Sequence, residues 1–316
     1  MKLIKPRSEL SKLALLGCVV PTTAGAIVIQ IDTTYDTGGF FANGTDKRAR
    51  LEDATGFFEG ILADDLDAIT PTGTFAFFGN DSWSAEFTNP SSGNLEFVDD
   101  LIVPADTLIL YVGARDLPGA EIGKGGFGLF DIVSVVGSSF DQAVRTRGET
   151  DVGFTDFAPW GGYLSVDSEI TWDTTLAGAG GSDQHLYSTL IHEIGHALGL
   201  GTAASWNAQV SSARFTGIES TAEHGGNVLV DFDSSTSTYP HWRDGITISN
   251  IYGTSTSQEA AMDPSITPGD VKLFTDLDVA ALDDIGWEIR APVPEPSQAL
   301  LLATGLAMFL RRRRAC

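Results

Sequence analysis

The sequence is poor in cysteine, with only Cys18 and Cys316 among 316 residues. Each lies near one end of the chain, in a segment that we expect to be removed during export. The residues between these two segments then form no disulfide, even in an oxidising compartment. Their stability must come from a hydrophobic core and from any bound cations.

Basic residues are also scarce, since 19 Lys and Arg stand against 42 Asp and Glu and give a formal net charge of -23. Nucleic-acid binding requires clustered Lys and Arg. A nucleic-acid partner is therefore excluded, and contact of the folded part with an anionic membrane face is disfavoured. The chain is 42% hydrophobic, which is enough to bury a sizeable core in one large domain or two small ones.

The first 26 residues have the pattern of a secretory signal peptide. Basic residues between positions 2 and 12 precede an apolar stretch at 13–20, and Ala24-Gly25-Ala26 supplies the small residues of a cleavage site. We expect removal of residues 1–26.

The other end, residues 291–316, carries Pro294-Glu295-Pro296, an apolar run at 299–310 and four arginines at 311–314. The run is too short for a spanning helix, which needs about 20 residues. The order of the three parts resembles the PEP-CTERM sorting signal of Gram-negative bacteria. That resemblance implies transient membrane contact through the tail, removal by an exosortase-type enzyme, and a final location at the cell surface, on the outer membrane or outside the cell.

Between these ends, strand and helix patterns alternate, which predicts a mixed α/β (α+β) fold. The expected elements are strands at 27–32, 75–78 and 108–112, an amphipathic helix at 46–69, and a last helix that starts at Thr275-Asp276 and stops at Gly286. Val279, Leu282, Ile285 and Trp287 are expected to pack in the core.

Two glycine-containing segments are harder to interpret. Residues 123–128 match Gly-x-Gly-x-x-Gly but do not follow a predicted strand, so they predict a flexible loop and no dinucleotide site. Gly162, Tyr163, Leu164 and Ser165 are predicted to lie in an edge strand, which could bind an extended peptide by strand addition. A glycine-rich loop at 176–181 then leads to Ser182 or Asp183, the expected N-caps of the next helix.

The segment 186–200 contains the strongest motif, His-Glu-x-x-His, in an apolar helix that should stop at Gly199. His192 and His196 are four residues apart, so they share one helical face and can approach a single zinc ion. Glu193 lies beside them as a base for a zinc-bound water. The apolar stripe of the helix comprises Leu186, Leu190, Ile194 and Ala197.

A catalytic zinc site normally has three protein ligands and one open position. The compact form of the motif would place the third histidine at 202, where this chain has Thr202. His185 would lie about 10 Å away along a continuing helix. His224 and His241 remain as candidates for the third ligand, and Glu219 would give a His-His-Glu set.

The zinc helix, followed by Phe215-Thr216-Gly217, the His241-Trp242 pair and Met262, resembles the metzincin zinc proteases and most closely their leishmanolysin-like branch. The resemblance covers roughly residues 150–290. It implies that His192, His196 and His241 bind zinc, that Glu193 is the base and that Met262 forms an apolar floor beneath the metal. The gap from His241 to Met262 is long for that family, and no tyrosine follows the methionine.

The same resemblance implies one catalytic domain over residues 27–290, with a twisted mixed sheet and the active-site helix in an upper subdomain (27–200) and a smaller lower subdomain (201–290). We therefore expect a secreted zinc endopeptidase that acts on polypeptides. The alternative is a zinc-binding but non-proteolytic extracellular matrix or surface protein, and a weaker third reading is a carbohydrate-binding β-domain. Structural calcium could bind acidic loops such as Asp231-Phe232-Asp233, since calcium prefers several oxygen ligands.

Overall fold

The computed structural model describes residues 26–71, 81–149 and 156–290. Its centre is a four-stranded sheet in the order β1 (Val28–Asp32), β4 (Thr107–Arg115), β7 (Gly161–Asp167) and β5 (Gly123–Phe127). The first three strands are parallel, and β5 pairs antiparallel with β7 at one edge. The predicted mixed α/β class is confirmed.

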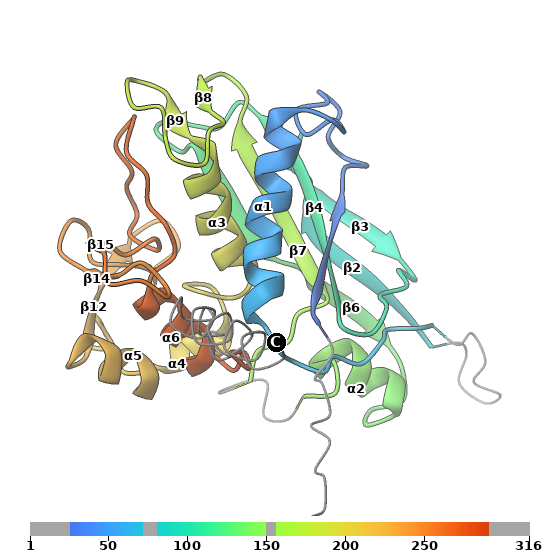
Figure 1. Ribbon diagram of the computed structural model, residues 1–316. Helices are drawn as coiled ribbons and strands as arrows, with labels where there is room; N and C mark the ends of the chain where they lie inside the picture. Colours follow the sequence, from blue (N-terminus) through green and yellow to red (C-terminus); the bar gives the residue numbers. More distant parts are fainter. Residues whose placement is uncertain (1–25, 72–80, 150–155, 291–316) are drawn as a thin grey trace, which may run out of the picture.

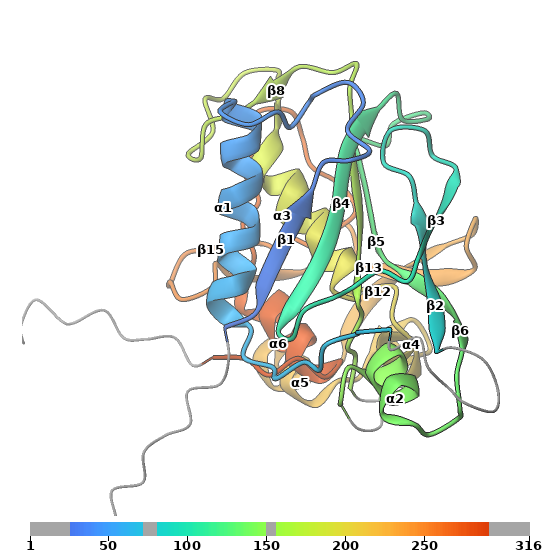
Figure 2. The same cartoon turned by 90° about the vertical axis from the view of Figure 1, so that its right-hand side faces the viewer.

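Helices cover one face of this sheet and a smaller sheet covers the other (Figures 1 and 2). On the first face, α1 (Asp46–Ile61) packs beside α3 (Leu186–Ala197). On the second face lies an antiparallel sheet of β3 (Leu95–Asp99), β2 (Ser82–Thr88) and β6 (Leu129–Val133), with α2 (Ser139–Thr146) below it. Aromatic side chains fill the space between the two sheets, where Phe87 stacks on Tyr111 at 4.2 Å between ring centroids.

Helix α1 begins where predicted but ends eight residues early. Thr45 caps its first turn by accepting from the Arg48 amide, whereas Leu62 leaves the helix with extended dihedral angles. Leu62 pairs with Ile289 and Ile69 pairs with Val103, so the chain gains tertiary backbone contacts in place of the last helical turns. The 46–69 prediction followed the apolar period, which continued through this extended stretch.

The structure corrects both interpretations of the glycine-containing segments. Residues 123–127 form strand β5, which occupies the edge of the sheet. The segment with Gly162, Tyr163, Leu164 and Ser165 is β7, an interior strand between β4 and β5. Its backbone is therefore paired on both sides, and the predicted edge role was wrong. Strand neighbours are set by tertiary pairing, which the local sequence pattern did not contain.

Helix α3 buries the predicted apolar stripe, Leu186, Leu190, Ile194 and Ala197. Its N-cap is His185 rather than Ser182 or Asp183, because the His185 ring accepts from the Ser188 amide. The helix stops as expected, since Gly199 follows it with φ +100°. The last helix, α6 (Asp276–Asp284), also has the predicted bounds, with a capping box at its start and Gly286 at φ +118° after its end.

The chain between α3 and α6 forms short elements to one side of the main sheet (Figure 1). They are α4 (Ala204–Ala208), β10 (Val210–Ser211), β11 (Arg214–Phe215), α5 (Ile218–His224), β12 (Val228–Asp233), β13 (Thr238–Trp242), β14 (Ile248–Asn250) and β15 (Ser257–Glu259). Before α3, β8 (Trp172–Asp173) pairs with β9 (Gln184–His185). Val279, Leu282, Ile285 and Trp287 are buried as predicted.

The expected signal segment, the sorting tail and the strand at 75–78 lie outside the described residues, apart from residue 26 of the signal segment. Within the described ranges, no helix has the length and hydropathy needed to cross a bilayer.

Candidate metal centre

Three histidine rings meet at one point between α3 and β13. The Nε2 atom of His196 lies 3.1 Å from that of His192 and 3.0 Å from that of His241, and the remaining pair is 3.3 Å apart. Across residues 26–71, 81–149 and 156–290, this is the one group of His, Cys, Asp and Glu side chains arranged to hold a metal ion. The preferred third histidine of the sequence analysis is therefore the one that the fold brings to the pair.

Hydrogen bonds on the far side of two rings determine which nitrogen carries the proton. His192 Nδ1 lies 2.7 Å from the carbonyl oxygen of Ala261, and His196 Nδ1 lies 2.8 Å from that of Leu200. A carbonyl oxygen only accepts, so both Nδ1 atoms donate and both Nε2 atoms present lone pairs. Lone pairs facing one another at this distance repel unless a cation lies between them.

The spacing of the nitrogens also suits a bound ion. A tetrahedral ion with bonds of about 2.0–2.1 Å to imidazole holds its nitrogen ligands about 3.3 Å apart. The observed separations of 3.0–3.3 Å are close to this value. The three histidines are therefore close enough together to bind one metal ion.

Burial keeps these rings neutral. Desolvation lowers the pKa of His196 to about 3, with a smaller contribution from His192 beside it. The pKa of His192 and that of His241 are also lowered, in both cases mainly by burial. Only the neutral imidazole binds a metal. The three rings are therefore in the metal-binding protonation state at neutral pH.

The third ligand reaches the centre through close packing of the backbone after α3. Strand β13 pairs with β12 so that His241 lies opposite Asp231. Pro240, the residue before His241, packs against the backbone of Gly201, which has φ +73°. A Cβ atom on Gly201 would be 1.9 Å from the Pro240 carbonyl oxygen, so only glycine allows this approach. Thr202, which stands where the compact motif has its third histidine, instead donates from its hydroxyl to the His196 carbonyl oxygen.

Met262 lies against the helix between the two histidines. It is fully buried, and a Cβ atom on Gly195 would be 2.7 Å from its sulfur. Its carbonyl oxygen accepts from the Trp242 amide at 3.0 Å. The hairpin of β14 and β15 accounts for the long sequence gap between His241 and Met262, because the chain leaves after Trp242 and returns beside it.

The side chain of Glu193, a residue of α3, packs against the edge strand β5. A Cβ atom on Gly123 would be 2.5 Å from its Oε1 atom, and one on Gly125 would be 2.1 Å from its carbonyl oxygen. Burial raises the pKa of Glu193 to about 8, and the Gly125 amide acts in the opposite direction. A cation in the centre would favour the carboxylate and lower this pKa. Sequence reasoning missed the role of β5, although glycines two residues apart fall on one face of a strand.

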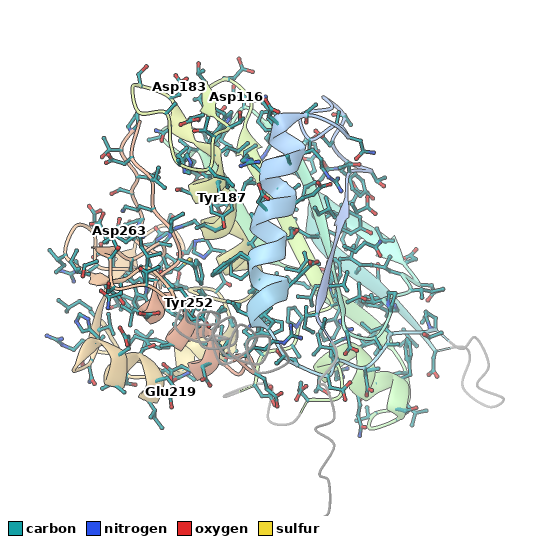
Figure 3. The ribbon with its side chains drawn as sticks, in the orientation of Figure 1. Asp116, Asp183, Tyr187, Glu219, Tyr252 and Asp263 are labelled. Carbon is teal, nitrogen blue, oxygen red and sulfur yellow. The ribbon has the colours of Figure 1, made fainter. Side chains whose placement is uncertain are left out.

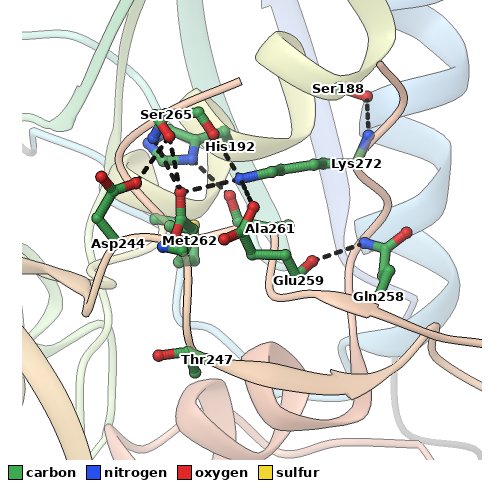
Figure 4. A network of polar contacts seen from close by, with 12 residues as sticks. Ser188, His192, Asp244, Thr247, Gln258, Glu259, Ala261, Met262, Ser265 and Lys272 are labelled. Carbon is green, nitrogen blue, oxygen red and sulfur yellow. Dashed lines mark hydrogen bonds and ion pairs between the residues drawn. The ribbon is translucent and has the colours of Figure 1, made fainter. Parts of the chain in front are cut away.

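A polar network links the turn at Met262 to helix α3 (Figure 4). The Lys272 ammonium forms ion pairs with Glu259 at 2.5 Å and with Asp263 at 2.9 Å, and the Lys272 amide donates to the Ser188 hydroxyl on α3. Asp263 also accepts from the Gly245 amide. The segment that carries Ala261, and with it the acceptor for His192, is thus tied to the helix that carries the motif.

The other candidate ligands lie elsewhere. His224 ends α5 and is exposed, and Glu219 lies in the first turn of the same helix, on the lower outer part of the molecule in Figure 3. His185 bonds to Ser188 and to the Thr175 carbonyl oxygen. The structure does not bring these side chains to the centre.

The proposed calcium loop at 231–233 has protein partners of its own. Asp231 pairs with Arg243, and Asp233 accepts from Ser235 and Thr236. Neither carboxylate belongs to a converging group of ligands among the described residues.

Comparison with known proteins gives no relative: no family model, no curated protein and no solved structure matches this chain.

Proposed function

We propose that the protein is an exported zinc-dependent endopeptidase of the metzincin type. The observation that carries the proposal is the convergence of three histidine Nε2 atoms within 3.0–3.3 Å, next to a glutamate that belongs to the same helix as two of them. Three imidazole ligands favour zinc, and a catalytic zinc site normally has three protein ligands and one open position.

The roles of the residues follow from their positions. His192, His196 and His241 would hold the ion, and the Ala261 and Leu200 carbonyl oxygens orient the first two rings. When bound, zinc lowers the pKa of a coordinated water to about 7 and polarises the scissile carbonyl. The Glu193 carboxylate would accept a proton from the attacking water and donate a proton to the leaving amine nitrogen.

The edge strand β5 is a better candidate than the interior strand β7 for binding an extended substrate. Among the described residues it pairs only with β7, so its other side has no strand neighbour. An extended peptide along that edge would run beside Glu193, because β5 packs on α3 at this residue. Strand addition supplies affinity through main-chain hydrogen bonds, independently of substrate side chains.

The decisive variant is Glu193→Gln, which keeps the size of the side chain and removes the base. The wild-type protein, loaded with zinc, should digest casein, and the variant should retain one zinc per chain while losing digestion by at least about 100-fold. Equal digestion by both proteins would reject the mechanism.

One observation favours a second candidate, a zinc-binding but non-proteolytic surface or matrix protein. Glu193 is only 6% exposed beneath β5. In a binding protein this carboxylate would have only a structural role. A wild-type protein that holds zinc and digests neither casein nor gelatin would support this alternative.

We further propose that residues 1–26 direct export and that residues 291–316 contact the membrane transiently before an exosortase-type enzyme removes them. The basis is the order of charged, apolar and Pro-Glu-Pro segments in the sequence. Terminal sequencing of the protein recovered from the cell surface tests both cleavages, and an intact tail would contradict the second.

A further inference from the structure

We infer that Asp278 is a positioning residue for the metal centre, which holds in register the strand that delivers His241 and the turn that orients His192. The inference rests on the proposed metal site and assigns a role to a buried carboxylate in α6.

Asp278 is fully buried, and both of its oxygens accept hydrogen bonds from neutral donors. Its Oδ1 atom accepts from the Trp242 indole at 2.8 Å and from the Met262 amide at 3.2 Å. Its Oδ2 atom accepts from the Ala261 amide at 2.8 Å, and from the amide and hydroxyl of Thr275 at 2.9 and 2.7 Å. A buried carboxylate with this many donors is held in one orientation.

Two of these contacts lead directly to metal ligands. Ala261 donates its amide to Asp278, while its carbonyl oxygen accepts from His192 Nδ1. Trp242 is bonded covalently to His241, and its indole donates to the same carboxylate. Asp278 is therefore connected through a single intervening residue to two of the three histidines, through Ala261 to His192 and through Trp242 to His241. Such outer-shell groups fix the orientation of ligating rings.

Helix capping alone does not account for this arrangement. The capping box of α6 needs only the reciprocal contacts of Thr275 and Asp278. The contacts to Ala261, Met262 and Trp242 come from two other segments, and these are the segments that form the floor and one side of the metal centre. A cap without a positioning role would have no need of them.

Asp278→Asn is the sharpest test, because an amide replaces one acceptor by a donor without a change in size. Whichever way the amide turns, its NH₂ group faces at least two of the five donors. We expect the folded variant to bind zinc 10- to 100-fold more weakly in chelator competition, the usual loss for an outer-shell change. The visible absorption spectrum of the cobalt-substituted protein should also change, since it reports ligand geometry.

Thr275→Val is the matched control. It removes the capping hydroxyl but leaves the contacts of Asp278 with Ala261, Met262 and Trp242 in place. This variant should lose thermal stability and keep its zinc affinity within about threefold of the wild type. Equal affinity in Asp278→Asn and wild type, or equal losses in Asp278→Asn and Thr275→Val, would overturn the inference.

A further variant covers a failure of Asp278→Asn to fold. Trp242→Phe keeps an aromatic ring and removes only the indole donor to Oδ1, and it should weaken zinc binding severalfold; unchanged affinity would count against Asp278. Zinc binding without peptidase activity would refute the proposed function but leave this inference standing. A wild-type protein that binds no divalent metal would refute both.

Discussion

Gly201 and Pro240 pass each other so closely that a Cβ atom on Gly201 would lie 1.9 Å from the Pro240 carbonyl oxygen. Gly201 follows the end of α3, and Pro240 precedes His241 in β13. The contact therefore holds the segment after α3 close to the strand that carries His241.

Gly201→Ala should therefore damage the metal centre. The methyl group meets backbone, which cannot rotate away, and φ +73° is unfavourable for alanine. We expect a loss of about 2–4 kcal/mol in the free energy of unfolding, from strain and overpacking together. Zinc affinity should fall at least tenfold.

Gly180→Ala is the control for the backbone cost alone. Gly180 has a similar φ of +71° and no atom within 4 Å of an added Cβ. The Gly180→Ala variant should lose only about 1 kcal/mol in the free energy of unfolding and keep its zinc affinity. Urea unfolding and chelator competition measure both quantities, and equal zinc affinities in the two variants would contradict the role of the close contact.

The choice of third ligand can be checked by metal content. His241→Ala should reduce zinc from one ion per chain to a small fraction after dialysis, because a two-histidine site binds weakly. His224→Ala changes the same residue type at an exposed position of α5 and should retain full zinc. Atomic absorption on both dialysed proteins gives the comparison, and zinc loss in His224→Ala would reverse the assignment.

The packing of β5 on α3 leads to a prediction about Gly125. An alanine there would place its methyl group 2.1 Å from the Glu193 carbonyl oxygen, so the strand or the helix must shift. We expect a loss of about 1–3 kcal/mol in the free energy of unfolding, typical of overpacking, and a large loss of peptidase activity. Casein digestion and urea unfolding report the two effects.

Gly56→Ala serves as the comparison for Gly125→Ala, because Gly56 lies in α1 with no atom within 4 Å of an added Cβ. Alanine should stabilise this helix by about 0.5–1 kcal/mol. If Gly125→Ala also proved neutral or stabilising, the close approach of strand and helix would not hold in solution.

Asp64 should make stability depend on pH. It is 2% exposed, and burial raises its pKa to about 7, to which the nearby charges of Glu149 and Glu288 add. The folded state then binds a proton more tightly than the unfolded state, whose pKa for aspartate is about 3.9. This residue stabilises the fold fully below about pH 4, and that contribution is lost as pH rises to 7.

Asp64→Asn should remove this loss. The free energy of unfolding of the variant, relative to that of the wild type, should rise by on the order of 1–3 kcal/mol as the pH increases from 5 to 8. Urea unfolding at each pH measures it. Parallel pH profiles for wild type and Asp64→Asn would show that the buried carboxyl does not titrate as described.

The sequence predicted the part of the site that depends on side-chain chemistry. His192 and His196 share a helical face because of their spacing. His241 was preferred, with His224 as the reserve, because the order of the zinc helix, the His241-Trp242 pair and Met262 resembles the leishmanolysin-like metzincins. The fold brings that set of nitrogens together. The last helix was also predictable, since Thr275 and Gly286 mark its ends by capping chemistry.

The parts that could not be predicted depend on tertiary pairing. Gly123 and Gly125 form a strand because β7 offers an edge and α3 tolerates only glycine against it. Helix α1 stops at Ile61 because Leu62 finds a partner in Ile289, more than 200 residues away. The local sequence contains neither partner. Asp278 was missed for the same reason, since three of its donors belong to other segments.

An ion held by His192 and His241 would join positions 49 residues apart in the chain. The ion would act as a cross-link in a region without cysteine. Closing a loop of this length lowers the entropy of the unfolded state and stabilises the folded state by about 4 kcal/mol. Unlike a disulfide, this link can be withdrawn by a chelator. Removal of the metal would therefore loosen the segment from Gly201 to Pro240 and lower the free energy of unfolding.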